Sequence, residues 1–187
     1  MAAREAALDL LSGEVLDVAR GLLGFRIRSD IGGSVTVVRL TETEAYAGEL
    51  DPASHAYRGE TRRNASMFGP PGTLYVYRSY GIHWCMNVVV EPIGTAHAVL
   101  LRGGEPVRGR RLIEGRRGRA DHLTDGPGKL CQALGVTGEQ DGSSLLDGPV
   151  RLLPGKLPDG YRITATPRIG IAKAADRPWR FVARPQS

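Results

Sequence analysis

The chain has 187 residues, of which 41% are hydrophobic and 24% charged, as expected for one globular domain with a core of useful size. No apolar run reaches the roughly 18 residues of a membrane-spanning helix, the charged N-terminus does not resemble a signal peptide, and two widely separated cysteines indicate a reduced, cytoplasmic protein. The net charge is +5 and the pI about 9.6, a balance that suits a polyanionic partner.

The first half of the chain passes from helical to strand patterns. Apolar residues recur at helical spacing over residues 4–11 and 14–23. The segment FRIRSDIGGSVTVVRLTETEAY then predicts two strands joined by a turn at Ser29–Gly33. Residues 47–72 are rich in turn-forming residues, which predicts a long loop.

The second half predicts a hairpin, further strands and two more helices. A helix is expected around 105–117, and a shorter one in DGPGKLCQALG, with Pro127 in its first turn and Gly135 at its end. Strands are expected over 73–77, 82–90 and 96–102, and near 149–153, 168–172 and 179–183. The whole pattern predicts an α+β fold: a single domain over residues 1–187, with a mostly antiparallel, curved sheet flanked by helices and a protruding β-hairpin.

Two glutamates follow apolar residues on one face of the second strand. Side chains alternate along a strand, so Val38, Leu40, Glu42, Glu44 and Tyr46 share a face in VVRLTETEAY. Carboxylates on a core-side face are costly unless they are paired or used in chemistry. The alternative is that the strand leaves the core at Glu42, so that both carboxylates meet water.

The expected hairpin lies in GTLYVYRSYGIHWCMN, which is unusually aromatic. Leu74 and Val76 point to one face of the hairpin, and Tyr75 and Tyr77 to the other. Tyr75 is expected to fill the sheet face. For Tyr77, packing against the sheet and contact with a ligand both remain open.

The tip of the hairpin carries Arg78, Ser79 and Tyr80. An exposed aromatic ring beside a cation suits insertion between nucleic-acid bases. The alternative for Tyr80 is an ordinary solvated turn residue.

Arginines are concentrated in residues 102–119, which hold seven arginines and two glutamates. The charge of this segment, seven minus two or +5, equals that of the whole chain. We expect Arg108, Arg110 and Arg111 to meet phosphates. Because only three of the 25 basic residues are lysines, a general bias toward arginine and a solvated helix is the alternative.

Several familiar motifs are absent from the sequence. It has no phosphate-binding loop with its lysine, no G-x-S-x-G elbow and no C-x-x-C. The histidines show no metal-ligand spacing; they are His55, His83, His97 and His122. We therefore expect neither a metal nor a cofactor.

An ordered series of short motifs resembles one known family. The pieces are ETEAY, SHAYRG, RRN…MF, PGTLYVY, YG, CMN, VLLR, EP and GPGKLCQAL, with a weaker echo in PRIGI and RPWRF. They cover most of residues 36–135 in the family's order. The chain resembles the alkyladenine (3-methyladenine) DNA glycosylases of the mammalian type, which also occur in bacteria. This resemblance implies an enzyme that flips a damaged purine out of duplex DNA and hydrolyses its N-glycosidic bond.

The resemblance also implies two catalytic residues. Glu44 matches the general base that activates water against the anomeric carbon of the sugar, and Arg102 matches the residue that helps hold this water. An anion near an electron-poor sugar and a poised water both favour the cleavage.

Other positions match residues that bind the nucleotide. Tyr46, His55 and Tyr77 match the walls of the base pocket, whose aromatic faces attract cationic rings by roughly 0.5–2 kcal/mol each. Tyr80 matches the side chain that enters the duplex, and Asn87 the residue that helps reject guanine. Arg78 and Ser79 make the tip more polar than in the mammalian members.

Two alternative functions are open to the sequence. A non-catalytic nucleic-acid-binding module would use the same hairpin and basic segment. A glycosylase that also nicks the strand would need a lysine Schiff base, but the first lysine in the chain is Lys129, which favours a monofunctional enzyme. The expected partner is double-stranded DNA with damaged purines, and not a membrane. The protein is expected to be a monomer in the cytoplasm, associated with the nucleoid in a bacterium.

Overall fold

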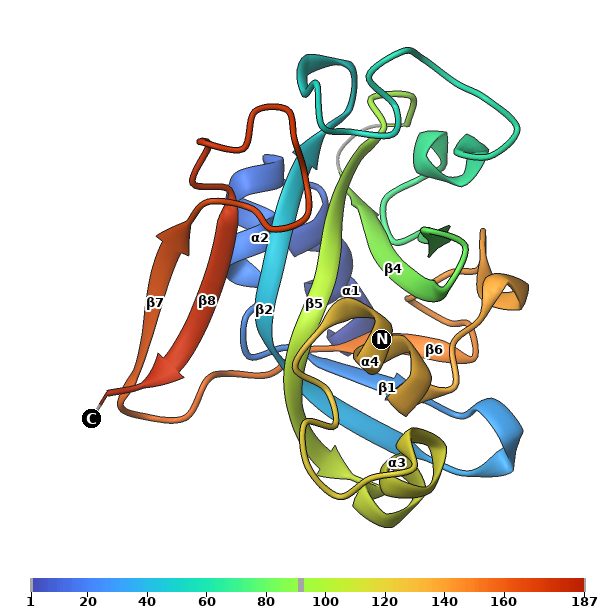
Figure 1. The fold of residues 1–187 in the computed structure, drawn as a ribbon, viewed down its shortest axis with the longest axis vertical. Helices are drawn as coiled ribbons and strands as arrows, with labels where there is room; N and C mark the ends of the chain where they lie inside the picture. The colour runs from blue at the N-terminus through green and yellow to red at the C-terminus, as the bar shows by residue number, and fades with distance from the viewer. Residues whose placement is uncertain (1, 91–92, 187) are drawn as a thin grey trace.

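A computed structural model describes residues 2–90 and 93–186, and an antiparallel sheet lies at its centre (Figure 1). The strands are β1 (Arg26–Ser29), β2 (Thr36–Ala47), β3 (Leu74–Ser79), β4 (His83–Val90), β5 (His97–Arg108), β6 (Val150–Leu153), β7 (Tyr161–Thr166) and β8 (Arg180–Pro185). They run in the order β3-β4-β5-β2-β1-β6, and β8 pairs with both β2 and β7. The predicted α+β class and antiparallel sheet are confirmed.

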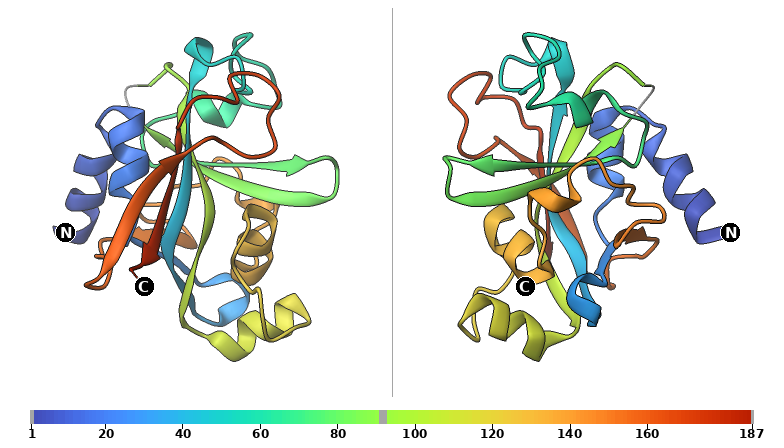
Figure 2. Two further views of the ribbon diagram at one scale, coloured as in Figure 1. Left: turned by 60° about the vertical axis from the view of Figure 1, so that its left-hand side comes forward. Right: turned by 90° about the vertical axis from the view of Figure 1, so that its right-hand side faces the viewer.

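Helices cover both faces of this sheet. The helices are α1 (Ala2–Leu11), α2 (Val15–Gly21), α3 (Arg110–Arg117) and α4 (Pro127–Leu134), with short 3₁₀ turns η1 (Ile31–Gly33), η2 (Gly48–Leu50), η3 (Ala65–Phe68) and η4 (Gly138–Gln140). Figure 2 shows α1 and α2 on one side, and α3, α4 and the protruding β3–β4 hairpin on the other. As predicted, Pro127 opens α4, and Gly135 ends it with a φ of +73°.

The buried core has two parts, and the β3–β4 hairpin contributes to both. The main cluster includes Leu74 and Val76 of β3. Tyr75 belongs to the second cluster, under residues 47–72, and Tyr77 packs against it. The predicted alternation along β3 is therefore confirmed, as is the burial of Tyr75, which is 1% exposed.

Two of the predicted elements are wrong. The helix expected over 105–117 begins only at Arg110, because β5 continues to Arg108 and pairs with residues 37–39 of β2. Gly109, with a φ of +79°, separates the strand from the helix. The strand expected near 168–172 is irregular; the strand lies at Tyr161–Thr166, where every residue pairs with β8.

The predicted single face of the second strand is interrupted. Register shifts between β2 and β5 fall at Leu40/Glu42 and at Glu42/Thr43, so residues before and after this point do not form one regular alternating row. Beyond it, the Thr43 hydroxyl donates to the Ala19 carbonyl in α2 at 2.7 Å. Glu44, the next residue, consequently faces away from α2.

Candidate active site

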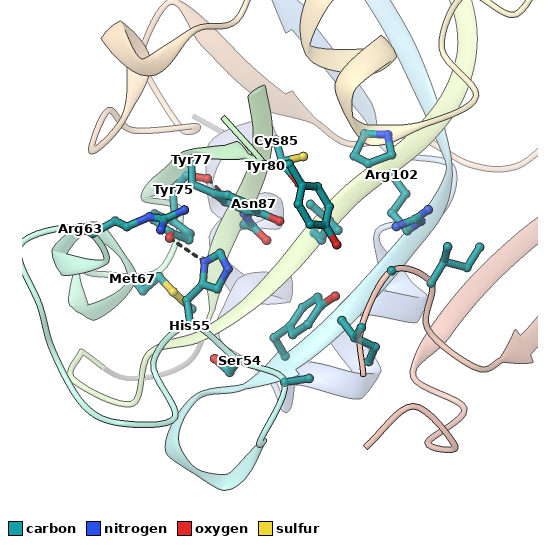
Figure 3. Close-up of a pocket in the computed structure, with 18 residues that line it drawn as sticks. Ser54, His55, Arg63, Met67, Tyr75, Tyr77, Tyr80, Cys85, Asn87 and Arg102 are labelled. Carbon is teal, nitrogen blue, oxygen red and sulfur yellow. Dashed lines mark hydrogen bonds between the residues drawn. The ribbon is translucent and has the colours of Figure 1, made fainter. Parts of the chain in front are cut away.

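A cavity of about 440 Å³ opens beside the hairpin (Figure 3). It lies where β2 and β5 meet the hairpin, the loop after β2 and the segment between β7 and β8. Its size is in the range of small-ligand sites. The predicted site residues that line it are Tyr46, His55, Tyr77, Tyr80, Asn87 and Arg102.

Glu44 is fully buried next to this cavity and is held on both oxygens. Its Oε1 accepts the backbone N–H of Ile169 at 2.8 Å and lies 3.3 Å from Arg102 Nη1. Its Oε2 accepts the Tyr46 hydroxyl at 2.9 Å. Burial, followed by the charge of Glu44, raises the pKa of Tyr46, so its hydroxyl stays protonated and donates. The two glutamates are paired, and the solvated alternative is wrong.

Glu42 is the second carboxylate of this network. Its Oε1 accepts Nε–H of Arg102 and Nε–H of Arg180, each at 2.7 Å. Burial opposes its ionisation, but hydrogen bonds from Arg180 and Arg102 outweigh this and lower the pKa of Glu42. Burial alone would lower the pKa of Arg102; the charges of Glu44 and Glu42 raise it instead. Glu42 and Arg102 therefore both carry their charges at neutral pH.

Aromatic rings form one wall of the cavity. His55 meets Tyr77 edge to face with centroids 4.5 Å apart, and Tyr75 stacks on Tyr77 at 5.5 Å. His55 Nδ1 lies 2.9 Å from the Tyr75 hydroxyl. Burial, helped by Arg63, lowers the pKa of His55 below 6.5, and burial raises the pKa of Tyr75 to about 12. The wall is therefore uncharged at pH 7 and can face a flat ring.

Asn87 is buried beside this wall, 4% exposed. Its amide N–H donates to the Tyr75 carbonyl at 3.2 Å, which fixes the side chain at the edge of the cavity. Cys85 lies two residues away on the same strand and also lines the cavity. Burial raises the pKa of the Cys85 thiol, so a neutral thiol faces the cavity.

Tyr80 lies at the hairpin tip and is 87% exposed. Its φ of +50° is unusual for a residue other than glycine. Ile82, which the sequence did not single out, stands in the same turn and is 67% exposed. Arg78 instead lies over the Trp84 ring, 5.5 Å from its centroid. The tip therefore presents a ring and an aliphatic side chain, with the cation held alongside.

The arginine-rich segment is not one uniform surface. Arg108, Arg110 and Arg111 are exposed as expected, although Arg110 already binds Glu114 at 2.9 Å. Arg102 belongs to the buried network instead. Arg116 turns inward and donates to the Ile31 carbonyl at 2.9 Å. Two of the seven arginines consequently have internal roles.

Sequence reasoning missed the segment between β7 and β8. Ile169, Gly170 and Ile171 line the cavity, and the side chain of the preceding Arg168 is buried. The PRIGI echo marked this segment in the sequence, but the strand predicted near 168–172 assigned it to the wrong structure. In the described part of the chain, no helix is long and apolar enough to cross a bilayer, and no cluster of His, Cys, Asp and Glu is suited to a metal.

A buried carboxylate beside an aromatic cavity, with an exposed ring on a nearby hairpin, is an arrangement that suits a nucleobase taken out of its stack. The comparisons with known proteins give the family. The family model for methylpurine-DNA glycosylase matches residues 9–187, and the chain belongs to this family of DNA repair glycosylases. A protein of Nitrosospira multiformis is 46% identical over 184 residues, which cover 97% of this chain and 91% of the relative. One of Agrobacterium fabrum is 50% identical over 180 residues, covering 95% and 88%. Both carry the name "Putative 3-methyladenine DNA glycosylase".

Proposed function

We propose that the chain removes alkylated or deaminated purines from duplex DNA by hydrolysis, with Glu44 as the general base. The arrangement of donors around Glu44 carries this proposal. A carboxylate offers about four acceptor positions, and three of them face Ile169 N–H, Arg102 and the Tyr46 hydroxyl. The fourth, on Oε2, is left for a water.

The reaction then follows from charge. Glu44 Oε2 takes a proton from the water, the water oxygen bonds to the anomeric carbon, and the electrons of the C–N bond leave with the base. Because the sugar becomes electron-poor as the bond breaks, a buried carboxylate close by stabilises the transition state. Arg102, fixed between Glu42 and Glu44, is placed to hold the water through its guanidinium.

The cavity also suits the leaving base. Purines such as 3-methyladenine carry positive charge, and the faces of Tyr46 and Tyr77 attract such rings. The neutral His55 adds no repulsion. No lysine is among the residues that line the cavity, which favours direct hydrolysis over a Schiff-base mechanism.

Release of free base tests this proposal. Duplexes with one defined lesion each should lose the base to the parent protein, while Glu44→Gln should abolish release and bind lesion duplex within a few-fold of the parent. Glu42→Gln, at the neighbouring carboxylate, should slow release without abolishing it, because Glu42 holds Arg102 but does not take the proton in this proposal. Near-normal excision by Glu44→Gln would remove Glu44 from this role and direct attention to Glu42.

The same assay separates the alternatives. A non-catalytic binding module would bind duplexes without releasing base from any lesion, and a covalent protein–DNA adduct trapped by borohydride would show a lyase. We further propose a monomer that acts in the cytoplasm on nucleoid DNA, because a site built from one chain needs no second copy. Sedimentation with and without DNA tests the monomer.

A further inference from the structure

The segment between β7 and β8 binds Glu44, the proposed general base, although the segment contains no helix or strand. Ile169, 51% exposed, lines the cavity and directs its backbone N–H at Glu44 Oε1. Figure 1 shows this segment as the red loop beside the upper part of β2. A loop that orients a reacting carboxylate needs a fixed backbone, and exposed side chains cannot supply it.

Arg168 supplies the fixed point. It is the one buried residue between Pro167 and Trp179. Its guanidinium donates to both carboxylate oxygens of Asp51, whose side chain is fully buried. It also donates to the Ala45 carbonyl of β2 at 2.9 Å. This planar group thereby ties the loop to two separate parts of the chain.

The Arg168 guanidinium also contacts Tyr46, the second residue that donates a hydrogen bond to Glu44. It lies between two rings, 4.7 Å from the centroid of Tyr46 and 5.1 Å from that of Trp179. Tyr46 is the residue whose hydroxyl donates to Glu44 Oε2. Arg168 is thus next to a donor on each oxygen of the Glu44 carboxylate. Ile169 follows it in sequence, and the Tyr46 ring lies against its guanidinium.

We infer that Arg168 is a positioning residue, which acts on Glu44 through the Ile169 N–H and the Tyr46 ring. It keeps the orientation of the carboxylate in which one acceptor position of Oε2 faces the water. Asp51 holds Arg168 in turn. The inference rests on the proposed role of Glu44, and it assigns function to a buried ion pair that does not line the cavity.

Two variants test the role of Arg168. Arg168→Met keeps an unbranched aliphatic stem but removes the guanidinium and its charge. Since an unpaired Asp51 is costly when buried, Arg168→Met/Asp51→Asn removes both charges and protects the test against unfolding. For either folded variant, we expect the rate of single-turnover excision to fall at least tenfold. This loss of rate should be at least ten times larger than the loss of affinity for lesion duplex.

Arg177→Met is the matched control. Arg177 also approaches Asp51, at 3.8 Å, and stacks on Trp179 at 4.6 Å, but it is remote from Ile169 in sequence. It should excise at the parent rate. Two results would show that Arg168 only stabilises the fold. The folded Arg168 variants would excise within twofold of the parent rate, or their excision rate and their affinity for lesion duplex would fall equally. Glu44→Gln in the same series separates the two ideas, because its normal activity would contradict the proposed function itself.

A different observation concerns the outer strands. Arg162 of β7 stands directly opposite Arg184 of β8, and like charges at such positions destabilise a sheet. Within residues 2–90 and 93–186, neither has an acidic partner. Both line a shallow groove with Thr164, Thr166 and Arg180. The folded protein therefore holds two guanidinium groups of like charge close together, and a bound anion would reduce their repulsion.

This groove shares a face of the sheet with the active site. Glu44 pairs with Arg180 in the β2–β8 ladder, and paired residues point to the same side. Phe181 and Ala183, which alternate with these arginines, belong to the main core. The row from Arg180 to Arg184 spans roughly 13 Å at about 3.3 Å per residue. It begins at the charged cluster of Glu42, Glu44 and Arg102 and runs away from the cavity.

We propose that this row binds phosphates of the duplex that flanks the lesion. Arg162→Gln/Arg184→Gln should lower the slope of log affinity against log salt by about 1.8, or 0.9 for each contact. Arg4→Gln/Arg20→Gln, on α1 and α2 across the sheet, makes the same change in net charge and should leave the slope near that of the parent. Equal slopes for the two double variants would overturn the assignment.

Discussion

Removal of the Tyr80 ring tests whether the hairpin tip fills the gap left by a flipped base. Tyr80→Ala keeps a side chain at the positive φ and so retains the backbone cost, while it removes the ring alone. At 87% exposure the ring contributes little to the core, and the free energy of unfolding should change by less than about 0.5 kcal/mol. Stacking of a ring on bases contributes about 1–3 kcal/mol, and about 1.4 kcal/mol is a factor of ten.

Excision from fully paired duplexes should therefore slow about tenfold, within a range of roughly 5- to 140-fold. The assay is single-turnover base release at saturating enzyme. Tyr80→Phe, which keeps the ring, should match the parent, and a lesion opposite a gap should be less affected because the stack there is already open. Equal rates for Tyr80→Ala and the parent on paired duplexes, with both proteins folded, would leave Tyr80 as an ordinary turn residue.

Three further outcomes follow from the site. Arg108→Gln/Arg111→Gln, at two exposed arginines at the end of β5 and in α3, should lower the slope of log DNA affinity against log salt by up to about 1.8; an unchanged slope would show that both face solvent. The pKa of His55 is lowered from 6.5, so acidification through that lowered pKa puts a second positive charge near Arg63. In a titration from pH 7 to 5, binding of a cationic 7-methylguanine duplex should weaken more than binding of a neutral hypoxanthine duplex; equal losses for the two duplexes would exclude His55 as the cause. Asn87→Ala should reduce the preference for hypoxanthine over guanine by about tenfold in matched duplexes, since these purines differ by one amino group; a constant ratio would contradict this.

Local patterns predicted the parts of the fold that local interactions stabilise. The β3–β4 hairpin was recognised because alternation and its turn lie within a short segment, and Tyr75 and Tyr77 point as that alternation requires. Likewise, α4 has Pro127 and Gly135 at its two ends. Such signals do not depend on what the rest of the chain does.

Long-range pairing overrode local patterns elsewhere. The residues after Arg102 had a helical pattern, but β5 extends to Arg108 because β2 offers a partner along its whole length. The Ile169 N–H reaches Glu44 across 125 residues of sequence. No periodicity could place that contact, because residues 167–179 have no regular structure and contain one buried residue, Arg168.

The charges beneath the cavity explain why two glutamates occur together in ETE. Glu42 binds Arg102 and Arg180, and Arg102 also faces Glu44, so two carboxylates and two guanidinium groups cancel. Without Glu42, the same cluster would carry a net positive charge at the place where the proposed reaction makes the sugar positive. In the proposed mechanism, Glu42 therefore lets Arg102 stay close enough to hold a water while Glu44 remains the uncompensated charge nearest the sugar. The first glutamate would then balance charge and the second would take the proton, and their two-residue spacing on one strand lets both bind the same arginine.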